Sequence, residues 1–174
     1  MNWTELLKAQ VESTYRATEG LLGMVDEKNL SWRPETGHNW MSMAQLLQHI
    51  PTACGACMKG FVTGDWNMPG AGDVSEMSPD EMLPPAERMP AAKSVAESRK
   101  ALAADKKLAL EMIAKAGEKN LASQMVAAPW NPVPRPLGQQ LLEMVGHLAQ
   151  HKGQLYYYLK LQATPVHTGH LYGM

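Results

Sequence analysis

The sequence predicts an all-α fold, a four-helix bundle, from two observations. Four stretches of the chain carry apolar residues at helical spacing and have recognisable start or stop signals, and no segment alternates apolar and polar residues as a half-buried strand would. Four amphipathic helices bury their apolar stripes by packing around a common core. Because 174 residues suit one sizeable core, residues 1–174 are expected to form a single domain.

The first two helices are predicted in the N-terminal third of the chain. The first carries a loose apolar stripe and ends at Gly20 and Gly23; the stripe consists of Leu7, Val11, Leu21 and Leu22. The second begins at Ser42, since Ser42 and Gln45 have the spacing of a capping box. Its apolar residues then recur at helical spacing as one continuous helix: Met43, Leu46, Leu47, Ile50, Cys54, Cys57 and Phe61.

The other two helices are predicted in the C-terminal half. The third follows Pro90 and closes at Gly117, with a stripe made of Val95, Leu102, Ala109, Leu110 and Ile113. The fourth begins after Pro136 and ends before Thr164, with a stripe made of Leu137, Leu141, Met144, Leu148, Leu155 and Leu159. Residues 127–136, which lead into it, are expected to be irregular.

The connection between the second and third helices is long enough to cross the bundle. Residues 64–90 far exceed the roughly 2 to 8 residues usual between neighbouring helices of a bundle. Within them, Ser78 and Glu81 repeat the capping signal and predict a single helical turn near Met82. The segment is interpreted either as a lid over a site or as a surface excursion without fixed structure.

Charge and hydropathy exclude some classes of partner. The 16 lysines and arginines nearly balance the 17 acidic residues, and no basic run occurs, so no nucleic-acid partner is expected. The first residues lack the apolar block of a signal peptide, and no stretch is apolar enough to span a bilayer. We therefore expect a cytoplasmic protein with no membrane partner.

Three histidines are candidates for a metal site. His147 and His151 are four residues apart and share one helical face; His151 falls within the apolar stripe and His147 borders it. His49 lies at the boundary of the stripe of the second helix. A core-facing imidazole must be hydrogen-bonded or ligated, because an unpaired buried polar group costs roughly 1 to 3 kcal/mol. Three imidazoles can hold a divalent metal; alternatively, they are ordinary boundary residues.

The sequence resembles the DinB-like (DinB/YfiT) superfamily over essentially its whole length. The motifs that carry the resemblance are Ser31-Trp32-Arg33-Pro34, the segment from Trp40 to Ile50, the segment from His147 to Leu155, and Tyr158-Leu159-Lys160. The resemblance implies an up-down-down-up bundle, often dimeric, with a divalent metal bound by His49, His147 and His151. The H-R-G-Q motif that is frequent in the family occurs here as His151-Lys152-Gly153-Gln154. Many members have a histidine directly before this motif, where this chain has Gln150. The three ligand positions are kept.

The resemblance also implies a chemistry. Characterised relatives include metal-dependent S-transferases and isomerases that use low-molecular-weight thiols, which predicts a small-molecule substrate such as a thiol. Because members are often dimeric, the resemblance also predicts a homodimer. Imidazole ligands suit zinc, nickel, iron and copper alike. Zinc or nickel is the expected metal, with iron or manganese as alternatives. A non-catalytic metal or small-ligand binding protein and a metal-assisted hydrolase stay open as other functions. Leu148 follows His147, so the H-E-x-x-H motif of zinc proteases is absent.

The residues near the three histidines have several possible roles. Glu143, one turn before His147, could support a ligand, act as a base, be a fourth ligand, or be a solvated surface residue. Gln154 could donate to a bound ligand or be a surface amide. Cys54 and Cys57 form a C-x-x-C, yet they are expected to pack in the core, because the predicted helix gives neither thiol a helix N-terminus.

The remaining histidines and the loop tryptophans are expected to be peripheral. His38, His167 and His170 fall in loops or in the tail, where a solvated position is expected, although the tail could fold over a pocket. Trp66 and Trp130 lie in the two irregular segments and either line a pocket mouth or anchor those segments to the core.

Overall fold

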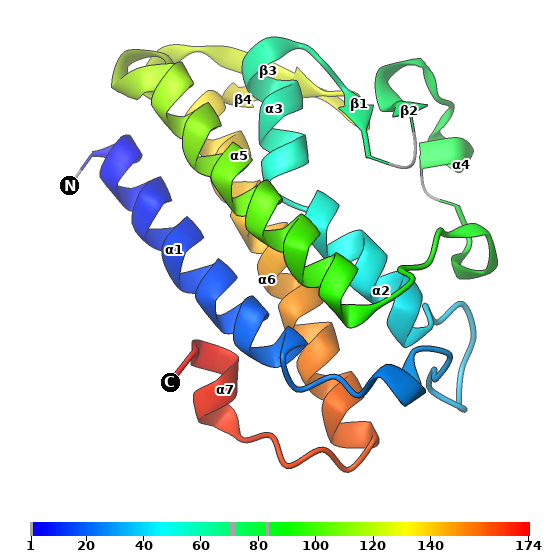
Figure 1. The fold of residues 1–174 in the computed structure, drawn as a ribbon. Coiled ribbons are helices and arrows are strands. Elements are labelled where there is room, and N and C mark those ends of the chain that lie inside the picture. The colour runs from blue at the N-terminus through cyan, green and yellow to red at the C-terminus, as the bar shows by residue number, and fades with distance from the viewer. Residues whose placement is uncertain (1, 70–71, 83) are drawn as a thin grey trace.

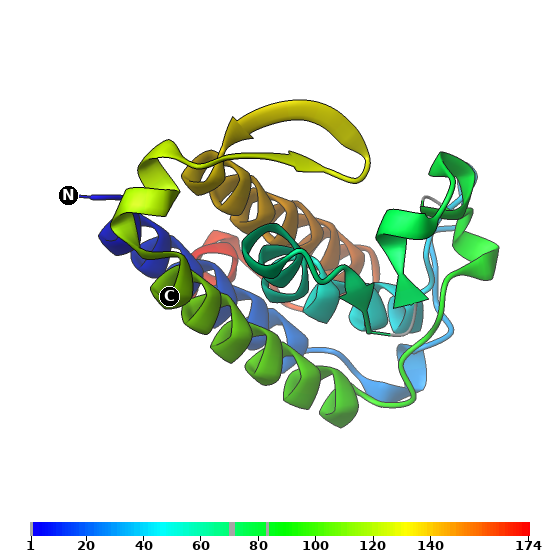
Figure 2. The ribbon, with the colours of Figure 1, turned by 90° about the horizontal axis from the view of Figure 1, so that it is seen from above.

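The computed structural model describes residues 2–69, 72–82 and 84–174 and is mostly helical, as predicted (Figure 1). Its main helices are α1 (Trp3–Leu22), α2 (Met43–His49), α3 (Gly55–Thr63), α5 (Val95–Ser123) and α6 (Leu137–Leu161). Helices α5 and α6 each contact α1 and α3, and the view from above in Figure 2 shows these helices gathered around one interior.

The interior is apolar and draws on every one of these helices. Fully buried side chains include Leu7, Leu46, Met58, Ile113 and Leu148. Burying such side chains is worth roughly 1.5 to 3 kcal/mol each, so this shared core is the main source of the helix packing.

Helix starts follow the capping signals in the sequence. Ser42 accepts the backbone N–H of Gln45, and the Gln45 side chain accepts the N–H of Ser42, which confirms the predicted capping box at the start of α2. Asn2 and Glu5 form the same arrangement at the start of α1. Helix α6 begins directly after Pro136, as predicted.

The prediction of one continuous second helix is wrong. Helix α2 ends at His49, a 3₁₀ turn η2 (Ile50–Thr52) follows, and α3 starts at Gly55. Pro51 has no backbone N–H to donate, and the backbone of Cys54 is far from helical, with φ −128° and ψ −74°. The apolar spacing runs through the break because both helices face the same core.

The third predicted helix needs two corrections. Helix α5 starts after the N-cap Ser94 rather than next to Pro90, and it continues beyond Gly117 to Ser123. Gly117 interrupts the helical backbone with φ 69° and ψ 157°, a conformation that glycine adopts without a steric penalty. The chain therefore kinks at the position where the sequence predicts an end.

Short strands correct the expectation that none occur. Strands β1 (Asn67–Met68) and β2 (Gly72–Asp73) pair antiparallel, and so do β3 (Met125–Ala128) and β4 (Asn131–Pro136). In the second hairpin Met125 lies opposite Pro136 and Ala128 opposite Asn131. Figure 2 shows this hairpin above the junction of α5 and α6.

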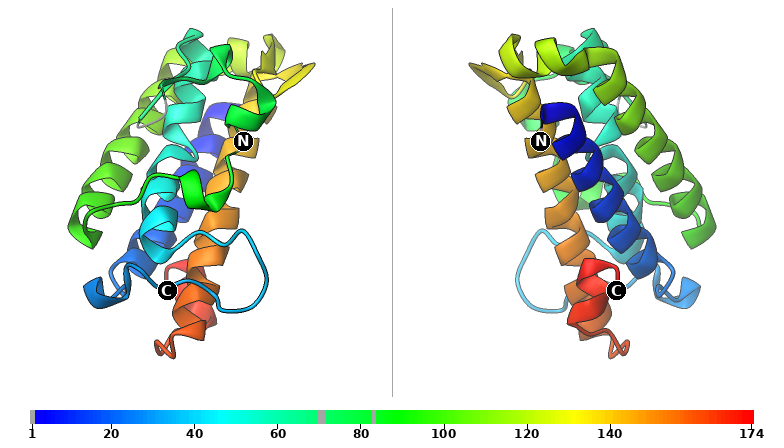
Figure 3. Two further views of the ribbon diagram at one scale, coloured as in Figure 1. Left: turned by 90° about the vertical axis from the view of Figure 1, so that its right-hand side faces the viewer. Right: turned by 90° about the vertical axis from the view of Figure 1, so that its left-hand side faces the viewer.

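The long segment between α3 and α5 is anchored to α2. It contains η3 (Val74–Glu76), α4 (Pro79–Met82) at the predicted helical turn, and η4 (Ala86–Arg88). Gln45 Nε2 donates to the carbonyls of Ala86 (2.5 Å) and Met89 (3.0 Å), and Ala86 N donates to Asn39 Oδ1 (2.7 Å). The left panel of Figure 3 shows the segment lying along α2 and α3.

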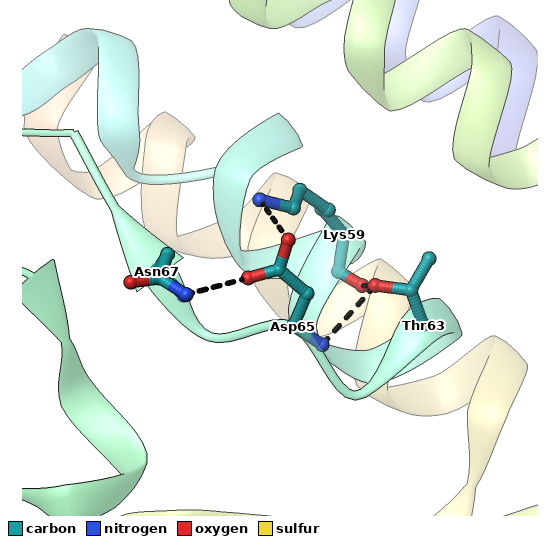
Figure 4. A network of polar contacts seen from close by, with 4 residues as sticks. All are labelled: Lys59, Thr63, Asp65 and Asn67. Atoms are coloured by element: carbon teal, nitrogen blue, oxygen red, sulfur yellow. Dashed lines mark hydrogen bonds and ion pairs between the residues drawn. The ribbon is translucent and has the colours of Figure 1, made fainter.

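Asp65 fixes the exit of the chain from α3 (Figure 4). Its carboxylate lies 2.6 Å from Lys59 Nζ and accepts two hydrogen bonds of 3.1 Å from Asn67, while its N–H donates to Thr63 Oγ1. These contacts, led by the one with Lys59, lower the pKa of Asp65 to about 2. The turn therefore directs the chain from α3 into β1.

The C-terminal tail is ordered against the first helix. Helix α7 (Thr168–Tyr172) packs on α1, and Lys152 Nζ donates to the Leu171 carbonyl at 2.8 Å. His167 and His170 cap this short helix reciprocally instead of folding over a pocket.

Among the described helices, none combines the length and the apolar character needed to cross a membrane.

Candidate metal centre

Three imidazoles meet between α2 and α6. His49 is the last residue of α2, and His147 and His151 occupy successive turns of α6. His151 Nε2 lies 3.0 Å from His49 Nε2 and 2.9 Å from His147 Nε2. The structure thus brings together all three histidines named from the sequence.

The spacing of these nitrogens fits a shared ion. At metal–nitrogen bonds of about 2.0 to 2.1 Å, two nitrogens with bond angles of about 90 to 109° lie about 2.9 to 3.4 Å apart. Both measured separations fall in that range, and the candidate ligand atoms of all three residues lie within 4.8 Å of one another. Within the described residues this is the one group of histidine, cysteine and carboxylate side chains close enough to hold an ion.

The rings are held in the neutral form that ligation requires. Burial lowers the pKa of His49 to about 3, and the charges of His151 and His147 contribute to this shift. Burial, together with the charge of His151, lowers the pKa of His147 to about 4. Burial also lowers the pKa of His151. Because an imidazole binds a metal only when neutral, these groups are ready to ligate at neutral pH without losing a proton first.

Two of the rings have a polar partner beside them. The backbone carbonyl of Ala53 acts on the ring of His147 and raises its pKa, against the larger lowering by burial. His151 Nδ1 lies 3.1 Å from Gln154 Oε1; Gln154 Nε2 donates to Tyr158 Oη (3.2 Å), which donates to the Met41 carbonyl (2.9 Å). Such partners fix the orientation of a ligating ring. Gln154 is therefore an orienting partner rather than a free surface amide.

Glu143 points away from the three histidines toward the β3–β4 hairpin. Its Oε1 accepts hydrogen bonds from Arg135 of β4 and from Gln139 (3.3 Å), and its side chain is 40 % exposed. The surface ion pair, one of the four readings of this residue, is the one that the structure shows. No fourth protein ligand joins the three histidines within the described residues.

Cys54 and Cys57 are free and buried, as predicted, but the premise about their position is wrong. Cys54 is the N-cap of α3, so the break in the second helix does create a helix N-terminus there. Burial nevertheless raises the pKa of both thiols, that of Cys57 to about 12. The pair is therefore held as thiols by its apolar surroundings.

The loop tryptophans anchor their segments to the end of α3. Trp66 packs edge-on against Phe61 and Trp130, and its ring covers Gly60, where an added Cβ would lie 2.2 Å from it. His38 instead lines a pocket of about 340 Å³ formed by residues 33–35, residues 37–40 and Glu87. Trp40 in its wall also packs edge-on against Tyr158, but none of the three clustered histidines lines this pocket.

The sequence reading missed a buried polar network beside the site. Asp105, Tyr15 and the start of α3 are joined by hydrogen bonds in the core. One signal was available: Asp105 is three residues after Leu102 and four before Ala109, so helical spacing places its carboxylate on the apolar face of its helix.

Comparison with known families is decisive for classification. The model of the DinB superfamily matches residues 10–155. The chain belongs to the DinB superfamily. A comparison with curated proteins found no match. This DinB superfamily member thus has, between α2 and α6, a histidine cluster that could hold a metal ion.

Proposed function

We propose that His49, His147 and His151 together bind one divalent metal ion, with zinc or nickel favoured by their three imidazoles. The observation that carries the proposal is the convergence of three neutral imidazoles: the Nε2 atoms of His49 and His147 each lie about 3 Å from that of His151, and all three ligand atoms lie within 4.8 Å of one another. The test is elemental analysis of protein purified without a nickel resin. About one divalent ion per chain supports the proposal; a metal-free protein that also binds no added Zn²⁺, Ni²⁺ or Co²⁺ contradicts it.

We further propose that the metal-loaded protein is a metal-dependent S-transferase acting with a low-molecular-weight thiol. A divalent ion held by three histidines has positions open for another ligand and lowers the pKa of a thiol that binds there. Gln154 would keep His151 oriented during substrate exchange.

Cobalt substitution separates a catalytic from a closed site. Titration of the Co²⁺ form with glutathione, bacillithiol and mycothiol should give near-ultraviolet charge-transfer bands that disappear in His151→Ala. Consumption of the thiol with an epoxide or alkyl halide would support transfer. No spectral change and no consumption would favour the alternative, a non-catalytic metal-binding protein.

The proposal includes a molecular organisation. In Figure 1, α1 and α6 run in one direction while α2–α3 and α5 run in the other, which supports an up-down-down-up four-helix bundle formed as one domain by residues 1–174. We propose a homodimer, supported by Tyr157 and Leu161, exposed one turn apart on α6. Light scattering after gel filtration tests the dimer.

A further inference from the structure

Asp105 is a carboxylate buried in the core that the proposed metal chemistry does not use. It lies on α5 and is 4 % exposed. It accepts hydrogen bonds from Tyr15 Oη (2.5 Å), Gly55 N (3.0 Å) and Ala56 N (2.8 Å). A buried carboxylate is costly unless it is hydrogen-bonded, so this set of three donors is what allows it to remain in the core.

The two backbone donors are the first residues of α3. The N-cap residue, Cys54, makes no side-chain capping bond, so Asp105 caps this helix from another helix. The approach is close: a Cβ on Gly55 would lie 2.1 Å from the Asp105 carbonyl oxygen. Glycine at position 55 therefore lets α5 and the start of α3 touch.

The segment that Asp105 holds connects two of the proposed ligands. His49 ends α2, and the backbone of Ala53, four residues later, acts on the ring of His147 closely enough to raise its pKa. Between them, Thr52 Oγ1 donates to the His49 carbonyl at 2.8 Å, and the turn η2 packs on both α5 and α6. A displacement of the start of α3 would therefore move the Ala53 carbonyl and the turn that follows His49.

We propose that Asp105, oriented by Tyr15, is a positioning residue of the metal centre, because it fixes the α2–α3 break on which the rings of His147 and His49 depend. The inference rests on the proposed metal binding. A carboxylate suits the task because its two oxygens accept all three donors, whereas an amide would turn an NH₂ group toward one of them.

The test compares Asp105→Asn with the unchanged chain, using Co²⁺ as the probe. The variant is expected to bind Co²⁺ about 10 to 100-fold more weakly, in a competition with a chelator, and to show a changed visible spectrum. Glu118→Gln is the control matched in geometry, since Glu118 also accepts two backbone N–H groups and one hydroxyl, at the start of α1. Leu121→Ala, a fully buried site beyond the Gly117 kink, is the control for lost stability.

Equal affinity and an identical spectrum in Asp105→Asn and the unchanged chain would overturn the inference and leave the metal function standing. If the unchanged chain binds no Co²⁺, the metal function fails. The imidazole ¹⁵N chemical shifts of His147 in the metal-free proteins then test whether Asp105 positions this ring. A shift in Asp105→Asn larger than that in Leu121→Ala supports it; equal shifts refute it. Should Asp105→Asn not fold, Tyr15→Phe, which removes one of the three bonds, takes its place with the same readouts.

Discussion

His49 Nε2 and His151 Nε2 lie 3.0 Å apart, although 102 positions separate the two residues in the chain. The same nitrogen of His151 lies 2.9 Å from His147 Nε2, so His151 is the central member of the cluster. The two helices that carry these rings are held together by the core on one side and by the Tyr158 hydrogen bond to the Met41 carbonyl on the other.

Replacing any one of the three histidines by alanine should lower metal occupancy by well over tenfold. Each ring supplies one of three proposed ligands, and two imidazoles hold a divalent ion far less tightly than three. Elemental analysis of protein purified without a nickel resin gives the readout. His38→Ala, which removes an exposed loop histidine, is the control and should keep full occupancy. Unchanged stoichiometry in His49→Ala would show that the ligand set is wrong.

The stability of the metal-free protein should fall as the pH drops from about 6.5 toward 4. The folded-state pKa values of His49 and His147 are lowered to about 3 and about 4, so the unfolded chain takes up protons first. Asp105 opposes this, because burial raises its folded-state pKa to about 6, but two histidines with larger shifts outweigh it. The net loss by pH 4 should be on the order of 3 kcal/mol.

Urea unfolding between pH 7.5 and 4 measures this dependence. The variant His49→Ala should show a flatter profile, since it lacks the histidine whose pKa is lowered further. For the same reason, bound metal should be released at a lower pH than the value of about 6.5 expected for unperturbed imidazoles. A folded protein equally stable at pH 7 and pH 4.5 would contradict these assignments.

Cys54 and Cys57 should react slowly with thiol reagents in the folded protein. Both are buried and burial raises both pKa values, so little thiolate forms at neutral pH. Labelling with a disulfide reagent should be about a hundredfold or more slower than in the same chain unfolded in urea, because it requires local opening. Fast labelling of both thiols without denaturant, with an apparent pKa below the usual value of about 8.5, would refute this.

Gly60→Ala should destabilise the protein by about 1 to 3 kcal/mol, because the new methyl group would collide with the Trp66 ring. Gly20→Ala is the control: it lies within α1 with no atom close to the added Cβ, and should stabilise by about 0.5 to 1 kcal/mol. Thermal and urea unfolding measure both. Equal stabilities for the two variants would mean that Trp66 does not pack on α3 as described.

Tyr158→Phe should weaken metal binding about tenfold without removing a ligand. The change deletes the hydroxyl that accepts from Gln154 and donates to the Met41 carbonyl, so His151 loses the support of its orienting partner. Tyr157→Phe is the matched control, since the neighbouring ring is 63 % exposed. Competition with a chelator gives the affinities; equal values for the two variants would exclude a role for the Tyr158 hydroxyl.

The helices and the three histidines could be predicted because their signals are local. Ser42 and Gln45 specify a helix start on their own, and the four-residue spacing of His147 and His151 defines a shared face. Helical spacing placed His49 at the boundary of its apolar stripe, the family resemblance made it a candidate ligand together with the other two, and the geometry places it beside His151.

The features that sequence reasoning missed depend on contacts between distant segments or on conflicting local signals. Pro51 breaks a helix whose apolar spacing continues on both sides, so periodicity alone could not detect the break. Prolines 132, 134 and 136 argue against a strand in the sequence because they lack a backbone N–H, yet β4 pairs with β3 through its other backbone groups. Helical spacing places Asp105 on the apolar face of its helix, but its partners come from α1 and α3 and cannot be identified from its own segment.

The order of the three histidines along the chain also bears on how the protein is made. A ribosome that has added His49 must add 102 more residues before His151 exists, which takes about 5 to 20 seconds at ordinary rates of synthesis. Until α6 has emerged and docked, the nascent polypeptide contains isolated imidazoles but no convergent set of nitrogens. Assembly of the cluster is therefore a late event in biosynthesis, and it reports that the first and last thirds of the chain have come together.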